Sequence, residues 1–598
     1  MLKKFIALLT QPERWSAVLL MCMILVMTFI EMLGVASILP FMAVLTNQEL
    51  VQTNAALNTA FTISGNIGIQ TTEQFLLALG VLVFVLLITS LTFKALTTYV
   101  QIRFAMMREY SIGKRLVESY LHQPYSWFLN QHSSDLGKTI LSEVRVVIDY
   151  GLIPLITIMA QGAAALALMI LMLAVDTLLA LSVGVTLGLA YAVIFAVVNF
   201  RLKSLGQLRI QANQERFALV NEAFCAVKEV KVGGLEKAYI RRFTKPSKIY
   251  AKAQATAIVI GQLPRFVIEA IAFGAVLLVI IYFMEKSGSL VAALPVIALY
   301  IFAGYRLIPA LQQIYGAFTQ LRFASPALDA LHKDISRIQV LNVEQSQITP
   351  LPLNQDIFLN NISYRYPNAL QSALKGIHLK ILANSKVGLV GVTGSGKTTT
   401  IDVILGLLEP QEGRISVDSQ LITDTNRRQW QRTIGYVPQH FYLIDNSVAA
   451  NIAFGVNATD IDQQAVERAA KIANLHDFVM NELPQGYATV VGERGARLSG
   501  GQRQRIAIAR ALYHKPRVLI LDEATSALDN LTEQVVMEAI SNLGSGITII
   551  LIAHRLSTVR QCDQIYLLEH GEIKDSGTYD QLITNSKQFA AMFRNNKI

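Results

Sequence analysis

The sequence of 598 residues has few cysteines, few tryptophans and little charge. Its three cysteines, Cys22, Cys225 and Cys562, are far apart and odd in number, which argues against a disulfide framework or a cysteine metal site. Charged residues make up only 16% of the chain, hydrophobic residues make up 53%, and the mean hydropathy is +0.42. A chain this apolar is not an ordinary soluble protein, and its composition predicts membrane-spanning segments.

The positive charge is concentrated in the apolar half of the chain. Residues 1–350 contain 28 Lys and Arg against 19 Asp and Glu, a net charge of +9, whereas residues 351–598 have a net charge of +1. A nearly neutral soluble half does not predict nucleic-acid binding. The apolar run that begins at Ser16 continues past Ile30 without an obvious processing site, so it does not resemble a cleaved signal.

A membrane span needs about 20 mainly apolar residues, and the sequence predicts six of them. They are Ser16–Leu45, Phe75–Gln101, Ile148–Val175, Thr177–Asn199, Ala255–Met284 and Leu290–Ile314. The loop Thr46–Thr72 has no Lys or Arg, whereas Arg201–Lys252 has twelve against four acids. The positive-inside rule therefore places the first loop outside and both termini in the cytoplasm.

Two polar stretches, Arg103–Val147 and Arg201–Lys252, keep helical periodicity between predicted spans. This pattern predicts helices that continue past the bilayer and turn around in the cytoplasm. We expect the turns at Gln123–Asp135 and Gly233–Pro246, as contact points for the soluble half; the alternative is an ordinary cytoplasmic loop.

Five charged residues, Glu31, Lys94, Arg265, Glu269 and Arg306, lie inside predicted spans, where charge is costly and suggests function. Arg265 and Glu269 are four residues apart and can pair on one helix face. Lys94 and Arg306 have no partner at helical spacing. They either face a water-filled cavity or snorkel to an interface. Three cations in a cavity, Lys94, Arg265 and Arg306, would favour a phosphate or pyrophosphate headgroup.

The soluble half contains a P-loop sequence, G-x-x-x-x-G-K-[ST], at Gly391–Thr398. A strand-like run precedes it and a helical run follows, which is the arrangement that lets backbone N–H groups and a helix N-terminus bind phosphates. Lys397 is placed to contact the phosphates and Thr398 to bind Mg²⁺. The predicted phosphate-binding residues here are Gly391, Thr393, Gly394, Ser395, Gly396, Lys397, Thr398 and Thr399.

Further motifs flank the P-loop. Tyr366 lies about 25 residues before it and can stack on an adenine ring, although it can also be a core tyrosine. Gln439 ends a strand and can reach Mg²⁺ and an attacking water. The sequence Ser499-Gly500-Gly501-Gln502 precedes a helix and predicts a second phosphate-binding N-terminus.

Two more strands end in polar residues. The run Val518–Leu521 leads to Asp522, which suits Mg²⁺, and to Glu523, which suits a base or water-orienting role. Ser526–Asp529 follows. A later strand ends at His554, placed to sense a γ-phosphate, although an isolated histidine is more often structural.

Together these motifs resemble the nucleotide-binding domain of an ABC transporter, with Walker A, Q-loop, LSGGQ, Walker B, D-loop and H-loop in family order. Six spans ahead of one such domain resemble a type IV exporter half-transporter. The expected fold is an all-α membrane domain, residues 1–342, a linker at 343–354, and an α/β P-loop domain at 355–598. Pro350 and Pro352 mark the linker.

The resemblance implies an ATPase coupled to transport, with ATP and Mg²⁺ at the site and Glu523, His554 and Gln439 as catalytic residues. It implies a homodimer in which Lys397 of one chain and Ser499 of the other enclose each ATP. It also implies that the two cytoplasmic turns are coupling helices. The expected location is a bacterial inner membrane, with the nucleotide-binding domain in the cytoplasm.

The first span, with Phe29–Gly34 and Leu39–Phe41, is similar to that of PglK-type flippases for lipid-linked oligosaccharides. Those proteins have short helices in the first external loop, and Asn54–Phe61 has suitable apolar spacing. The resemblance predicts transport of a polyprenyl-pyrophosphate-linked oligosaccharide. The alternatives are a general lipid or multidrug exporter, including the lipid A type, and an ATP-gated channel, for which one crippled ATP site would be usual.

Overall fold

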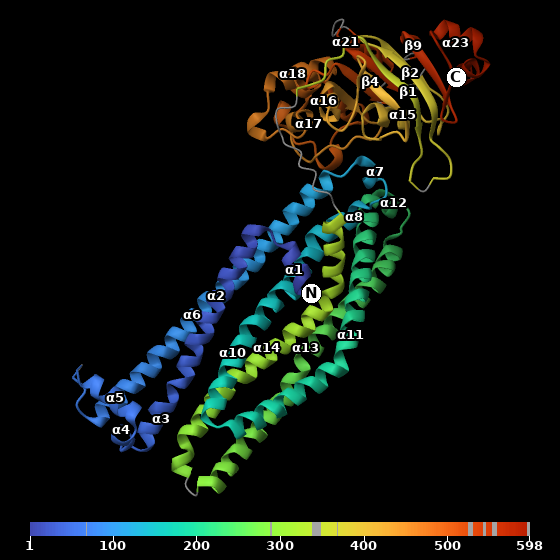
Figure 1. Cartoon of the computed structure of the whole chain (residues 1–598). Coiled ribbons are helices and arrows are strands. Elements are labelled where there is room, and N and C mark those ends of the chain that lie inside the picture. The colour runs from blue at the N-terminus through green and yellow to red at the C-terminus, as the bar shows by residue number, and fades with distance from the viewer. Residues whose placement is uncertain are drawn as a thin grey trace. The chain divides into compact units, whose positions relative to one another are not determined.

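A computed structural model describes residues 1–66, 68–287, 290–337, 349–367, 369–523, 530–541, 546–552 and 559–594. The chain divides into two compact units (Figure 1). The helical unit comprises Met1–Gln123 and Asn130–Leu341, and the sheet unit comprises Pro124–Leu129 and Asn342–Ile598. The exact domain limits predicted from the sequence stay predictions, because residues 343–348 of the linker lie outside the described residues.

The helical unit is built from long helices joined by short turns. Its helices are α1 (Leu2–Leu8), α2 (Gln11–Ala36), α3 (Ile38–Thr46), α4 (Leu50–Thr53), α5 (Ala55–Gly65), α6 (Thr72–Leu121), α8 (Ser133–Lys138), α9 (Val144–Val147), α10 (Ile153–Val175), α11 (Thr177–Cys225), α12 (Val227–Val232), α13 (Glu236–Ser287) and α14 (Leu290–Arg337). Two π-helical turns, Thr139–Glu143 and Ile148–Leu152, connect α8, α9 and α10 into one helical run. The pair α2 and α6 and the pair α11 and α13 each lie side by side (Figure 1).

The helices α6, α11, α13 and α14 are longer than a membrane requires. At 1.5 Å per residue, the 50 residues of α6 extend about 75 Å, compared with a hydrocarbon core of about 30 Å. The predicted helical extensions beyond the bilayer are therefore present in α6, α11 and α13. In the described part of the chain, three helical segments are apolar and long enough to span a membrane: Gln11–Thr46, Thr72–Leu121 and Ser134–Val175. The other three predicted spans lie within α11, α13 and α14.

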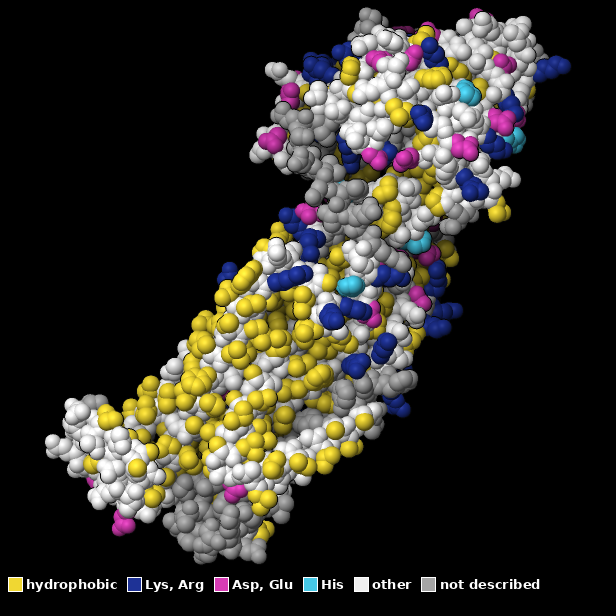
Figure 2. Space-filling model, in the orientation of Figure 1, with side chains coloured by type: hydrophobic (Ala, Val, Ile, Leu, Met, Phe, Trp, Pro, Cys, Tyr) yellow, Lys and Arg dark blue, Asp and Glu magenta, His cyan; other side chains and the backbone are white. Residues whose placement is uncertain are grey.

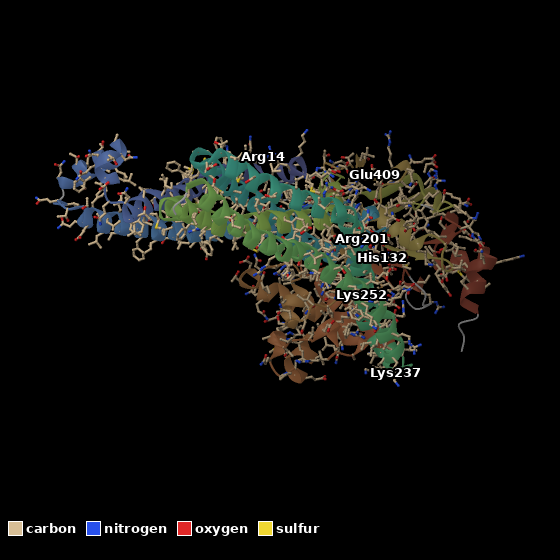
Figure 3. All side chains as sticks on the ribbon, turned by 90° about the horizontal axis from the view of Figure 1, so that it is seen from below. Arg14, His132, Arg201, Lys237, Lys252 and Glu409 are labelled. Atoms are coloured by element: carbon tan, nitrogen blue, oxygen red, sulfur yellow. The ribbon has the colours of Figure 1, made fainter. Side chains whose placement is uncertain are left out.

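The surface of the helical unit separates hydrophobic from basic residues. Hydrophobic side chains cover the middle of the long helices, and Lys and Arg gather toward one end (Figure 2). Three of these cations lie on the helix pair α11 and α13. Arg201 belongs to α11, and Lys237 and Lys252 belong to α13 (Figure 3). This distribution agrees with a cytoplasmic location for the helical extensions.

The two turns differ from prediction in their extent. α6 ends at Leu121, and the four-residue helix α7 (Tyr125–Phe128) precedes α8, inside the predicted range Gln123–Asp135. The second turn is much shorter than Gly233–Pro246, because α13 begins at Glu236 and runs through Pro246. Gly234 lies in the short turn between α12 and α13 and has φ +59°, which glycine adopts without strain. α13 continues through Pro246 although a proline inside a helix loses one backbone hydrogen bond and crowds the preceding turn.

Close helix contacts fix the helical unit internally. At Gly206 on α11, an added Cβ would lie 2.2 Å from the carbonyl oxygen of Phe323 on α14, so only glycine permits this approach. A core of Val35, Leu168, Leu299 and Leu307 joins α2, α10 and α14. The loop after α3 contains α4 and α5, and the Asn54 side chain caps α5, so the short helices predicted for this loop are present.

The sheet unit contains two sheets. Its strands are β1 (Asp356–Tyr364), β2 (Leu374–Leu382), β3 (Lys386–Val390), β4 (Glu412–Val417), β5 (Gln420–Leu421), β6 (Ile434–Val437), β7 (Val518–Asp522), β8 (Thr548–Ile552), β9 (Gln564–Glu569) and β10 (Glu572–Gly577). Its helices, apart from α7, are α15 (Lys397–Ile404), α16 (Arg427–Thr433), α17 (Val448–Ile452), α18 (Gln463–Ile472), α19 (His476–Glu482), α20 (Gly500–Leu512), α21 (Asn530–Ser541), α23 (Tyr579–Asn585) and α24 (Lys587–Arg594).

One sheet is antiparallel, with strand order β2-β1-β4-β5, and the other has the order β10-β9-β3-β8-β7-β6. In the second sheet β3, β6, β7, β8 and β9 are parallel. Every residue of β7 and β8 is buried, which explains their unbroken apolar sequences. The carboxyl ends of parallel strands meet at one edge of a sheet, so the residues that follow β3, β6 and β7 come together there.

Candidate nucleotide site and membrane charge cluster

The P-loop connects β3 to α15 and is shaped by its glycines. At Gly391, an added Cβ would lie 2.2 Å from the carbonyl oxygen of Leu568, so no side chain fits. Gly396 has φ +105° and occupies the N-cap position of α15, where the backbone turns sharply into the helix. The loop therefore forms a concave backbone surface at a helix N-terminus, as phosphate binding requires.

Two polar groups of this loop are suited to bind phosphate oxygens. The Lys397 Nζ donates hydrogen bonds to the carbonyl oxygens of Gly391 at 2.8 Å and Val392 at 3.0 Å. Burial lowers the pKa of Lys397, while the carboxylates of Glu523 and Asp522 act in the opposite direction. The buried Ser395 hydroxyl has no hydrogen-bond partner among the residues that the structure describes. An unsatisfied donor beside a lysine fits an anionic ligand.

The predicted Q-loop and Walker B residues meet. The Gln439 Nε2 donates a 2.7 Å hydrogen bond to Glu523 Oε2, which joins the ends of β6 and β7. Asp522 is buried as the last residue of β7. Glu523 has φ +51°, a conformation that non-glycine residues adopt at a cost and that often accompanies function. This geometry holds the Glu523 carboxylate at the sheet edge that also carries the P-loop.

A second carboxyl group close to Asp522, that of Asp402 on α15, is also buried. Burial, with a smaller contribution from the charge of Asp522, raises the pKa of Asp402 to about 6. Burial also raises the pKa of Tyr436, whose hydroxyl hydrogen-bonds to Asp522. Sequence reasoning missed Asp402, because it reads as an ordinary helical residue and belongs to none of the motifs.

Tyr366 is partly buried against the core of the sheet unit. Its hydroxyl lies 3.1 Å from Thr399 Oγ1, and its ring packs edge-on against Tyr364 at 5.1 Å. The side chain also borders a cavity of about 640 Å³, lined by Arg365, Gln411 and others. Tyr366 is thus tied to the P-loop helix, and its stacking on adenine stays a prediction.

The LSGGQ motif forms a capped helix start. Ser499 is the N-cap of α20, and its hydroxyl accepts a 3.2 Å hydrogen bond from the Gln502 backbone, while Gln502 Oε1 accepts one of 2.8 Å from the Ser499 backbone. Gly500 and Gly501 fill the first turn, where backbone N–H groups point outward. The predicted sensor His554 and the segment Ser526–Asp529 lie outside the described residues.

Two of the three cations predicted for the substrate cavity, Lys94 and Arg306, form a cluster with Glu31 that sequence spacing did not reveal. Glu31 Oε1 on α2 lies 3.1 Å from Lys94 Nζ on α6 and 2.8 Å from Arg306 Nη1 on α14. Lys94 and Arg306 therefore do have a partner, which spacing within one helix could not reveal because Glu31 lies on another helix. Arg265 is exposed on α13. The predicted Arg265–Glu269 pair is untested, since the Glu269 side chain lies outside the described part.

Family comparisons agree with both halves of the chain. The family model "ABC transporter transmembrane region" matches residues 17–291, and the family model "ABC transporter" matches residues 374–526. A curated relative is 32% identical over 81% of both chains.

The chain belongs to the ABC transporter family. That relative is the ATP-dependent lipid A-core flippase of Ralstonia nicotianae. A lipid A-core flippase of Cupriavidus metallidurans is also 32% identical over 80% of both chains. The Nostoc heterocyst differentiation ATP-binding protein HepA is 30% identical over 79% of this transporter and 76% of its own length.

A solved bacterial Atm1-family ABC exporter with ATP bound has the same fold, with a TM-score of 0.78 over 98% of both chains at 23% identity. The predicted recognition as an ABC exporter half-transporter is confirmed, as are the fold class and the ATPase activity coupled to transport. The finer similarity to flippases of lipid-linked oligosaccharides stays a prediction.

Replacing Glu523 by Gln tests the role of its carboxylate. We expect ATP binding to persist and steady-state hydrolysis to fall by about 10²-fold or more, because a neutral amide orients and deprotonates water poorly. Phosphate release and nucleotide binding are measured on the reconstituted transporter, with the exposed Glu482→Gln as control. Near-normal turnover would remove Glu523 from catalysis.

Replacing Asp402 by Asn tests whether burial raises the pKa of this carboxyl group. The folded protein holds the Asp402 proton more tightly than the unfolded chain does. The free energy of unfolding of the wild type therefore falls as pH rises from about 4 through the folded pKa of about 6. Asp402→Asn avoids this loss. We expect it to be more stable than wild type by about 3 kcal/mol at pH 7.5 and by roughly half of that at pH 5.

Thermal unfolding of the purified transporter at the two pH values measures this difference. The exposed Asp445→Asn is the control and should show no such change with pH. An Asp402→Asn protein whose advantage is equal at both pH values would contradict the raised pKa of Asp402.

Proposed function

We propose that this transporter is a homodimeric, ATP-driven flippase that moves an amphiphile with a phosphate-bearing headgroup across the bacterial inner membrane. The observation that carries the proposal is the membrane cluster, in which Lys94 and Arg306 share one carboxylate, Glu31. An uncompensated cation within a span costs about 2.5–3.5 kcal/mol on insertion scales, so a chain that keeps two of them around one acid has a use for the excess charge.

Two kinds of lipid have this headgroup chemistry. A polyprenyl-pyrophosphate-linked oligosaccharide is the substrate that we favour, on the similarity of the first span and on the external helices α4 and α5. A lipid A-type glycolipid is the alternative, supported by the named activity of the relatives from Ralstonia and Cupriavidus. Both carry phosphate groups on an apolar lipid, and they differ in the chain and in the sugar.

In the cytoplasm, the residues of the nucleotide site position ATP and a water molecule. Mg²⁺ fits the oxygen-rich set of Thr398, Gln439 and Asp522, because it prefers oxygen ligands and is usually held by few protein groups and phosphates. When bound, it neutralises phosphate charge. Lys397 and the P-loop backbone hold the β- and γ-phosphates, and Glu523, oriented by Gln439, accepts the proton of the attacking water.

Two chains are needed if the capped N-terminus at Ser499 closes on the ATP that Lys397 of another chain holds. This arrangement explains why one chain carries one P-loop and one LSGGQ motif. A two-fold homodimer then gives two equal sites. ATP binding closes them, and hydrolysis separates them to reset the membrane helices.

A complementation experiment tests the shared sites. Ser499→Arg places a bulky cation at the helix N-terminus, and Lys397→Ala removes the phosphate contact, so either homodimer should hydrolyse ATP at only a few per cent of the wild-type rate. A mixed dimer, purified with two different tags, contains one site with both halves intact and should regain a large part of one site's activity. Lack of recovery in isolated mixed dimers would contradict shared sites.

Replacing both Arg265 and Arg306 by Ala tests the substrate. We expect flipping of a polyprenyl-pyrophosphate oligosaccharide in proteoliposomes to fall at least 10-fold while basal ATP hydrolysis survives, because lost cations weaken headgroup binding and leave the nucleotide residues unchanged. The control is Lys252→Ala, an exposed cation at the cytoplasmic end of α13.

Parallel assays with lipid A and a cationic dye separate the candidate substrates. Transport of lipid A alone would favour the alternative glycolipid. A well-folded double variant that flips lipid at the wild-type rate would overturn the phosphate-headgroup proposal, and a neutral or cationic amphiphile would then be the better candidate.

A further inference from the structure

The membrane charge cluster has an unequal number of opposite charges. The same oxygen, Glu31 Oε1, accepts from Lys94 Nζ and Arg306 Nη1, and the three side chains together carry a net charge of +1. The second oxygen, Glu31 Oε2, is buried and has no hydrogen-bond partner among the described residues. One carboxylate oxygen therefore accepts from two cations, while the other accepts no hydrogen bond from the residues that the structure describes.

The exposure of the three side chains is also unequal. The Glu31 side chain is 5% exposed, whereas that of Arg306 is 16% and that of Lys94 is 32% exposed. The carboxylate is thus enclosed, and the cations are the part of the cluster that a molecule from outside can reach. An anion can approach Lys94 and Arg306 without first contacting Glu31.

We propose that Glu31 is an internal counter-ion that the acidic headgroup of the transported lipid displaces. This inference rests on the proposed function, and it identifies Glu31 as the residue that sets the affinity of that site for the headgroup. In the absence of substrate, Glu31 neutralises part of the charge of Lys94 and Arg306. A phosphate or pyrophosphate group replaces Glu31 as the acceptor of their hydrogen bonds. When the headgroup leaves, the two cations pair with Glu31 again.

Counter-ion exchange suits a carrier, because a transported molecule must leave again. Two bare cations in apolar surroundings would bind a phosphate group tightly and release it slowly. Competition from Glu31 weakens this binding, since each headgroup contact must replace an existing ion pair. The three partners come from α2, α6 and α14, so exchange also alters the contacts that tie these helices together.

The alternative is that the cluster is a fixed brace between helices. The two accounts predict opposite effects of Glu31→Gln, which keeps the side-chain shape and removes the charge. If Glu31 competes with the headgroup, Glu31→Gln should bind farnesyl pyrophosphate about 10-fold more tightly than wild type and flip lipid several-fold more slowly. If Glu31 is only a brace, affinity should stay equal or fall.

The experiment uses the full transporter in lipid nanodiscs and measures binding of farnesyl pyrophosphate, with uncharged farnesol as the matched ligand. The control variant is Glu13→Gln, which removes another buried carboxylate of α2, one paired with Arg108 at 2.8 Å. We expect tighter binding only for Glu31→Gln and only for the pyrophosphate. An equal gain for farnesol, or for Glu13→Gln, would overturn the proposal.

A second variant keeps the test decisive should Glu31→Gln fold poorly. Arg306→Gln leaves a balanced Lys94–Glu31 pair, and counter-ion exchange predicts at least a 10-fold loss of pyrophosphate affinity, whereas a brace predicts none. Wild-type protein that flips a phosphate-bearing lipid while both variants keep wild-type affinity would overturn the inference alone. Wild-type protein that neither binds nor flips any such lipid would overturn the proposed function as well.

Discussion

A buried charge must be met by an opposite charge or by a ligand, and this constraint organises both units of the transporter. In the sheet unit, Lys397 is buried among carbonyl groups and is influenced by Glu523 and Asp522. In the helical unit, Glu31 is buried beneath Lys94 and Arg306. Because desolvation is costly for each of these groups, their positions are strongly coupled to those of their partners.

The constraint is met incompletely at each proposed ligand site. The Ser395 hydroxyl is buried without a hydrogen-bond partner among the described residues, beside the lysine of the P-loop. Burial, with a smaller contribution from the charge of Asp522, raises the pKa of Asp402 to about 6. Such groups lower stability, and proteins commonly keep them where binding or chemistry uses them.

The sequence predicted that the P-loop, Gln439 and the Walker B carboxylates meet, because each of them follows a strand of one parallel sheet and the sheet brings these strand ends together. Gln439 and Glu523 are 84 residues apart, yet both were identified, and they share a hydrogen bond. Asp402 was missed because its burial depends on packing and not on a local pattern. In the membrane half, Lys94 lies 63 residues from Glu31 and Arg306 lies 275 residues from it, so helical spacing could not reveal the cluster.

A second ion pair in the helical unit shows what a structural brace looks like in this fold. Arg209 on α11 lies 2.6 Å from Glu143, and Asn213 donates to the other Glu143 oxygen at 3.2 Å. Both members are almost fully buried, one cation meets one anion, and the arginine also lies over the ring of Phe323. The pair is balanced and out of reach of a ligand. The cluster at Glu31 has an excess cation and accessible partners, and these two differences favour exchange over bracing.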